Sequence, residues 1–395
     1  MRRSFNRTLA LLPVLVISTL ASLPAAAQNC EAKLGAIGPM SGGAAAWGLA
    51  AKAGAEFAAA LANEDGGLQM GNRKCRVKVV TYDAQYTAAG GAAASNFLAS
   101  ENVKVTLGPV GSPETTGFRP VAKRHGQINF SSSYMAGVIG PEFPLSFHAL
   151  QSPVTWGPLL VKAAADQFKF KSVMVVGAND QGGTDGSKQL IKLYGEAGIK
   201  GTEEYYQRGT TNFGPIAARI INAKPEAVDL ATMPPQDTTV LVKALMDAGY
   251  NGVIGALGGA GAPPVLQGAG GPEKLKGFYW LEVSPLDHPG VVKLKADYQR
   301  VMKAAPPDNP LFPVFALAAE VALKGMAAAG TDSDVEKIAD ALRKSTPESR
   351  YLGKAGWRGK SIYGLNQELS FPVGLGLVVD GKKLPVKTIN IPSEQ

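Results

Sequence analysis

The chain has 395 residues, which suggests two domains, and its 45% hydrophobic and 18% charged residues are ordinary for a globular protein. The formal net charge is +8, but no cluster of lysine and arginine with interleaved aromatic residues stands out. The composition therefore argues against nucleic-acid binding.

Residues 1–27 have the pattern of a secretory signal, with a basic start, an apolar middle and an A-x-A cleavage site that ends at Ala27. The apolar middle, Leu9–Leu20, is too short to favour a membrane anchor. Asn29 stands before Cys30 where a lipoprotein needs a small residue, which disfavours a lipid anchor. We expect export, with cleavage near Ala27.

Strands and helices alternate along the first third of the chain, which predicts a parallel sheet with helices on both faces. The strands are expected at Lys33–Gly38, Arg76–Tyr82, Val103–Leu107 and Ile128–Phe130, and the helices at Trp47–Asn63, Thr87–Ser100 and Thr115–His125.

The alternation restarts after a connecting strand at Phe147–Leu150, and this predicts a second α/β domain of similar size. Phe278–Val283 reads as a strand that crosses back, and Asp380-Gly381 is a hairpin signal within Ser370–Lys387. The other expected strands are Ser172–Val176, Gly201–Gln207, Ala227–Thr232 and Gly252–Ala256, and the helices are Val154–Phe168, Thr184–Ala197, Phe213–Asn222, Thr238–Ala248, Pro289–Ala304, Pro313–Ala329 and Asp334–Lys344.

Cys30 and Cys75 each stand just before a predicted strand. If these strands are parallel neighbours, the two cysteines meet at one edge of the sheet, close enough to bridge. An oxidising compartment favours the bond. We predict a disulfide between them, the alternative being two separate thiols.

The stretch Val103–Gly117 predicts an anion site. Gly108-Pro109 is expected to stop its strand, and Ser112-Pro113-Glu114 reads as a helix start with Ser112 at the N-cap. Unpaired N–H groups at such a start, together with the helix dipole, attract a carboxylate or another small anion. The same pattern also fits a capped helix without a ligand.

Several motifs, in this order and at these spacings, resemble the leucine/isoleucine/valine-binding branch of the periplasmic solute-binding proteins of ABC importers. They are Lys33–Gly42 (KLGAIGPMSG), Trp47-Gly48, Ala53–Glu56, Asn63–Gly67, Val80–Asp83, Leu107–Ser112 and Ala248–Tyr250. The resemblance implies two doubly wound parallel-sheet lobes joined by three hinge segments, with the solute in the cleft between them.

It also implies a periplasmic monomer that closes about its hinge and docks on an inner-membrane ABC permease, with no cofactor. The expected N-terminal lobe is 28–147 plus 283–366, and the C-terminal lobe is 148–282 plus 367–395.

The resemblance carries over to individual residues. Ser112 matches a serine that holds the ligand carboxylate, and Ser133 and Met135 match the next ligand-contacting turn, where the Ser-Ser-Ser-Tyr run that ends at Tyr134 could supply more donors. Trp47 matches an aromatic position at the cleft mouth. In the second lobe the matching positions are Gln181 or Gly182, and Gln236, where the family usually has tyrosines.

Leu257 departs from the family, because amino-acid binders normally place there an acid that pairs with the ligand's ammonium group. A buried ammonium without a partner costs several kcal/mol. Asp180 or Asp237 could substitute, so an amino-acid ligand stays open. The simplest interpretation is a small organic acid, aromatic or branched aliphatic, with room for its body beside Gly258–Ala262.

The sequence shows no sign of a catalytic site. Its three histidines, His125, His148 and His288, lack metal-site spacing, and no G-x-S-x-G, P-loop or G-x-G-x-x-G motif occurs. An exported hydrolase or a ligand-sensing module are the remaining alternatives. His148, near the first expected crossing, is a candidate for contact with ligand or hinge.

Overall fold

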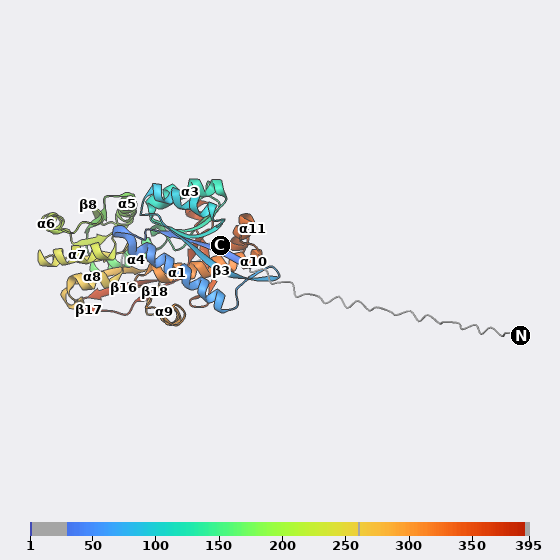
Figure 1. Ribbon diagram of the computed structural model, residues 1–395. Helices are drawn as coiled ribbons and strands as arrows, with labels where there is room; N and C mark the ends of the chain where they lie inside the picture. Colours follow the sequence, from blue (N-terminus) through green and yellow to red (C-terminus); the bar gives the residue numbers. More distant parts are fainter. Residues whose placement is uncertain (2–29, 260, 392–395) are drawn as a thin grey trace.

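The structure is a computed structural model that describes Met1, residues 30–259 and residues 261–391. The predicted signal at 1–27 lies outside the described residues except for Met1. The described part folds into two α/β lobes, each built on its own sheet, and they lie side by side in Figure 1.

The first sheet has the strand order β14-β15-β6-β5-β4-β1-β3-β2. Its central pairs are parallel, while β2 and β14 join antiparallel at the edges. The edge strands β2 and β14, and β15 next to β14, were not expected from the sequence. The strands are β1 (Glu31–Gly38), β2 (Leu68–Met70), β3 (Arg73–Asp83), β4 (Val105–Val110), β5 (Ile128–Ser132), β6 (Ser146–His148), β14 (Gly356–Arg358) and β15 (Glu368–Ser370).

The predicted disulfide is confirmed. Glu31 pairs with Arg76 in the parallel register of β1 and β3, so Cys30 and Cys75 stand opposite one another, with their Cα atoms 4.4 Å apart. Cys75 lies inside β3 rather than before it, because that strand begins at Arg73. The bond fixes the start of β1 to the neighbouring strand.

Helices cover this sheet, and several of them come from distant parts of the chain. Helix α10 is long and apolar enough to cross a membrane by composition, but most of its residues are buried in this lobe's core. It packs closely on α1, where a Cβ on Gly54 would lie 2.6 Å from the Ala316 amide nitrogen. The helices are α1 (Ala45–Glu64), α2 (Ala88–Ser100), α3 (Ser112–His125), α9 (Pro289–Met302), α10 (Leu311–Ala329), α11 (Val335–Lys344) and the short α12 (Lys360–Tyr363), with a 3₁₀ turn at Gly42–Ala44 and a small hairpin of β12 (Glu348–Ser349) and β13 (Gly353–Lys354).

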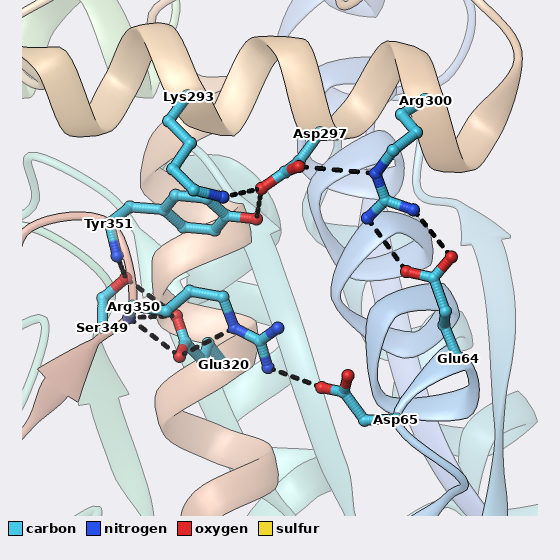
Figure 2. Close-up of polar contacts among 9 residues, drawn as sticks. All are labelled: Glu64, Asp65, Lys293, Asp297, Arg300, Glu320, Ser349, Arg350 and Tyr351. Carbon is cyan, nitrogen blue, oxygen red and sulfur yellow. Dashed lines mark hydrogen bonds and ion pairs between the residues drawn. The ribbon is translucent and has the colours of Figure 1, made fainter.

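A surface network of charges ties the returning chain to α1 (Figure 2). Arg300 of α9 forms two hydrogen bonds with the Glu64 carboxylate, at 2.7 and 2.9 Å. Arg350 reaches Asp65 at 2.9 Å, and its backbone N–H donates to Glu320 of α10. These contacts attach the segment that follows the second crossing to the first lobe.

The second sheet has the strand order β17-β16-β11-β10-β9-β7-β8, with β18 on β16. The predicted hairpin at Asp380-Gly381 is confirmed, since Val379 pairs with Lys382 and both turn residues have positive φ. Helix α8 was not expected. The strands are β7 (Ser172–Ala178), β8 (Lys200–Tyr206), β9 (Ala227–Leu230), β10 (Val253–Ala256), β11 (Gly277–Glu282), β16 (Val373–Val379), β17 (Lys382–Lys383) and β18 (Lys387–Ile389); the helices are α4 (Pro153–Phe168), α5 (Gln181–Glu196), α6 (Gly214–Ala223), α7 (Pro235–Asp247) and α8 (Ala262–Ala269), with a 3₁₀ turn at Pro272–Lys274.

The chain passes between the sheets three times, after β6, after β11 and after β15. The first sheet extends to His148 and Ser370, slightly beyond the expected changes of lobe at 147 and 366. The lobe boundaries themselves stay a prediction.

Candidate ligand-binding cleft

A pocket with about 590 Å³ of empty space, part of it open solvent, lies at the carboxyl ends of the strands of both sheets. Residues of both lobes and of two crossings line it, which places it between the lobes. The lining residues are Trp47, Tyr86, Val110, Gly111, Ser112, Ser132, Ser133, Tyr134, Pro310 and Leu311 from the first-lobe side, Leu150 and Val283 from the crossings, and Gly182, Thr232, Gly258 and Gly259 from the second lobe.

Helix α3 begins at the pocket wall, but its start differs from the prediction. Strand β4 continues through Gly108 and Pro109 to Val110, and Gly111 is the N-cap, with φ 91°. Ser112 is therefore the first helical residue, not the cap. Its side chain is 1% exposed, and its hydroxyl accepts a hydrogen bond from Ser133 at 3.2 Å. The N-terminal turn of α3, with its N–H groups and the positive end of its dipole, still faces the cleft.

Glu114, in the first turn of α3, fixes the two segments behind this helix start. Its buried carboxylate accepts the backbone N–H of Tyr86 at 2.9 Å and that of Val110 at 3.1 Å. Burial raises the pKa of Glu114 to about 8, although the two N–H donors pull it down. The raised pKa reduces the negative charge that Glu114 presents to the neighbouring anion site near neutral pH.

The turn after β5 forms the second polar wall. The Ser133 hydroxyl accepts the Met135 N–H at 3.2 Å, while the Ser133 N–H donates to His148 Nε2 at 3.1 Å. His148 Nε2 accepts a hydrogen bond from the Ser133 backbone N–H and not from its hydroxyl. It is therefore not placed to activate Ser133 as a nucleophile. Its other nitrogen faces Glu368 at 3.4 Å. This arrangement gives no support to the hydrolase alternative.

Tyr134 projects from the first-lobe turn into the second lobe. Its ring centroid lies 6.4 Å from that of Trp156 in α4. A Cβ on Gly186 would lie 3.3 Å from the Tyr134 ring, and one on Gly258 would lie 3.5 Å from it. Small residues in the second lobe therefore make room for this side chain.

Residues 31–366 match the pattern of the protein family described as periplasmic binding protein. The chain belongs to the periplasmic binding protein family.

Individual relatives agree with this assignment. A Pseudomonas aeruginosa protein named leucine-, isoleucine-, valine-, threonine- and alanine-binding protein is 24% identical over 88% of this chain and 91% of its own length. Among solved structures, leucine-binding protein LivK of Thermotoga maritima aligns with TM-score 0.75 and 20% identity over 91% of this chain and 99% of that one. An R. palustris ABC transporter solute-binding protein in complex with 4-hydroxybenzoate aligns with TM-score 0.73 and 21% identity over 92% and 98%. The predicted two-lobed α/β fold is therefore confirmed.

The structure of this periplasmic binding protein places half of the predicted ligand contacts at the pocket wall. Trp47, Ser112, Ser133 and Tyr134 line it, as does Gly182.

The other predicted contacts lie elsewhere. Leu257 is fully buried in the second lobe's core, and its N–H donates to Asp229 at 3.2 Å. Gln236 is exposed, and Gln181 spans the lobes by donating to Thr116 at 2.8 Å. Met135 is partly buried beside Ser133, outside the pocket lining. Their ligand contacts stay predictions.

The two acids suggested as ammonium partners are already engaged. Asp180 forms an ion pair with Arg208 at 2.5 Å, and Asp237 accepts the Tyr206 hydroxyl at 2.8 Å. Among the described residues, no group of three or more histidine, cysteine, aspartate or glutamate side chains could hold a metal ion.

Asp185 on α5 was missed by the sequence interpretation. Burial raises its pKa, and an interaction with the Ser112 side chain across the cleft lowers it in part. One of its carboxylate oxygens, Oδ2, is buried and has no hydrogen-bond partner within the described chain. A signal was available, because Asp185 follows the predicted Gln181 by one helical turn and so shares its face of α5.

Proposed function

We propose that the protein is the periplasmic solute-binding component of an ABC importer and captures a small carboxylic acid with an aromatic or branched aliphatic body. The observation that carries this proposal is that one pocket combines a wall of hydrogen-bond donors with a wall of aromatic rings. The backbone N–H groups and the Ser112 hydroxyl at the helix start supply donors for a carboxylate, and the rings of Trp47, Tyr86 and Tyr134 supply an apolar wall.

The engagement of nearby acids supports a solute without an α-amino group. Asp180 is neutralised by Arg208, Asp237 is held by Tyr206, and Leu257 replaces an acid in the core behind the pocket. An ammonium group placed there would lose its hydration without gaining a counter-charge. The R. palustris relative, solved with 4-hydroxybenzoate, is an instance of this fold taking such an acid.

An amino-acid ligand is the second candidate, and Asp185 is the observation that favours it. Its buried Oδ2 lacks a described partner, and its carboxylate interacts with Ser112, so it could receive an ammonium group at the edge of the site. The Pseudomonas aeruginosa relative is named for amino-acid binding.

The proposed mechanism is hinge closure. The open form admits the solute, and contacts from both lobes then favour the closed form by their difference in affinity. Closure removes water from the carboxylate site and strengthens its hydrogen bonds. The closed monomer docks on an inner-membrane permease, which imports the solute with ATP.

The decisive experiment first identifies co-purified solute by mass spectrometry. Calorimetry then compares matched pairs that differ only in the α-amino group, such as 4-methylpentanoate with leucine and 3-phenylpropanoate with phenylalanine, beside benzoate and 4-hydroxybenzoate. The proposal expects the acids to bind more tightly than their amino-acid partners. Tight binding of leucine with no acid bound would overturn it in favour of the second candidate.

Asp185→Asn separates the two candidates further. If Asp185 receives an ammonium group, the substitution abolishes most leucine affinity. If the solute is an acid, the same substitution leaves binding unchanged or strengthens it, because a negative charge near the carboxylate is removed. Turnover of an ester or amide by the purified protein would instead support a hydrolase.

A further inference from the structure

Arg208 reaches across the cleft from the second lobe, where it follows β8. Its guanidinium lies 4.6 Å from the centroid of the Tyr86 ring and 5.3 Å from that of Trp47, both in the first lobe. The two rings are 5.7 Å apart and tilted by 49°, so one cation lies within cation–π distance of both rings of an aromatic pair. A Cβ on Gly43 would lie 3.6 Å from Arg208 Cγ, so the first-lobe backbone also approaches this side chain closely.

The guanidinium is held in this position from its own lobe. Its Nε and one terminal nitrogen donate to the two Asp180 carboxylate oxygens at 2.5 and 3.0 Å. Asp180 is itself fixed, because it caps α5 by accepting the Gly183 N–H at 2.9 Å. A third donor of Arg208 points to the Thr232 carbonyl at 3.4 Å. With only 9% of its side chain exposed, Arg208 is a rigid and largely desolvated cation.

These contacts have different fates when the lobes separate. The ion pair with Asp180 and the bond to Thr232 lie within the second lobe and survive opening. The contacts with Trp47 and Tyr86 join the two lobes and must break. Their energy therefore enters the open–closed equilibrium and not the stability of either lobe.

We propose that Arg208 is a positioning residue that holds the cleft closed by stacking on Trp47 and Tyr86, and that it also aligns these two rings as the aromatic wall of the solute pocket. The inference rests on the proposed solute-binding function. A desolvated cation–π contact of this kind shifts an equilibrium by about 5- to 30-fold. The apparent affinity for solute falls in proportion to the population of the closed form.

The test uses Arg208→Gln, with Arg219→Gln as the matched control. Arg219 also forms an ion pair from the second lobe, with Glu204 at 2.6 Å, but this pair lies within that lobe. Small-angle X-ray scattering of the ligand-free protein measures closure, and urea unfolding checks that each variant is folded. We expect R208Q to be more expanded than the parent protein and R219Q to be unchanged.

Arg208→Lys distinguishes stacking from charge. Lysine keeps the charge opposite Asp180 but lacks the planar guanidinium that covers both rings, so R208K should resemble R208Q more than the parent. A scattering curve for R208Q equal to that of the parent would overturn the proposal, and so would a fully closed R208K.

The scattering result needs no solute and therefore stands apart from the solute assignment. If no acid binds in calorimetry while scattering shows R208Q to be more expanded, the solute assignment is wrong and the proposed role of Arg208 is still supported. Where calorimetry does identify an acid, R208Q should raise its dissociation rate by about 5- to 30-fold without slowing association, because the open form admits the solute.

Discussion

His148 Nδ1 lies 3.4 Å from the Oε2 atom of Glu368, and both side chains are fully buried where the first and third crossings meet. Glu368 also accepts the Ser152 N–H at 2.9 Å and the Thr155 hydroxyl at 2.5 Å, at the start of the second lobe's first helix. Since His148 Nε2 accepts the Ser133 N–H, one continuous chain of hydrogen bonds joins the cleft wall to the hinge.

Replacing Glu368 by glutamine should lower the free energy of unfolding by about 2–4 kcal/mol, because an amide NH₂ would face donors that now meet a carboxylate. Urea unfolding measures this change. The control is Asp166→Asn, which breaks an exposed pair with Lys162 and should cost less than about 0.5 kcal/mol. Equal effects of the two substitutions would contradict a structural role for the buried pair.

Ser112→Ala should weaken binding of the acid found by calorimetry by about 1–3 kcal/mol, or roughly 5- to 150-fold, through loss of a hydrogen bond to a charged group. Ser100→Ala is the control, because the Ser100 hydroxyl donates only to the Phe97 carbonyl at the exposed end of α2. Unchanged affinity in the Ser112 variant would count against the anion site.

Gly182→Ala should obstruct closure without unfolding either lobe. A Cβ at Gly182 would lie 2.2 Å from the Tyr86 hydroxyl oxygen in the opposite lobe, while alanine suits the α5 backbone. We expect at least a roughly tenfold loss of solute affinity, because the clash with Tyr86 opposes closure. The free energy of unfolding should be undiminished, because alanine has a higher helix propensity than glycine by about 1 kcal/mol. Gly195→Ala in the same helix is the control, because nothing lies within 4 Å of its added Cβ. Similar affinities for the two variants would exclude this steric role.

Glu114 should make stability depend on pH. Its folded-state pKa is raised to about 8, whereas the unfolded carboxyl titrates near 4.5. The folded state therefore keeps a proton that the unfolded state has released, and this contribution to stability is complete below about pH 4.5 and lost as pH rises to about 8.

The fall is at most about 1.4 kcal/mol per pH unit. Urea unfolding between pH 5 and 8 should show a steeper decline for the parent protein than for Glu114→Gln. The exposed Glu348→Gln variant should retain the parent slope. Parallel curves for the parent and the Glu114 variant would refute the shift.

The alternation of elements and the disulfide were predictable because they follow from periodicity and from the positions of Cys30 and Cys75. The short strands β12 to β15 were not, since two- and three-residue strands carry no periodic signal and depend on tertiary pairing. The helix start was located within one residue, but Gly111 rather than Ser112 serves as the cap.

The second-lobe side of the site was harder to predict. Leu257 was expected at a position that carries an acid in amino-acid binders, yet it is buried in the second lobe's core and does not line the pocket. Arg208 meets first-lobe residues only because the lobes come together, and no local pattern indicates such a contact, whereas Asp185 could have been found from its place one helical turn after Gln181.

Tyr134 belongs to the turn that carries Ser133 but seats its ring beside Trp156 in the other lobe. When the lobes separate, either the Tyr134 ring leaves its place beside Trp156 or the turn that carries Ser133 moves with it. Both movements change the shape of the pocket around a bound solute. A permease that separates the two lobes would therefore release the solute without having to bind it more tightly than this protein does.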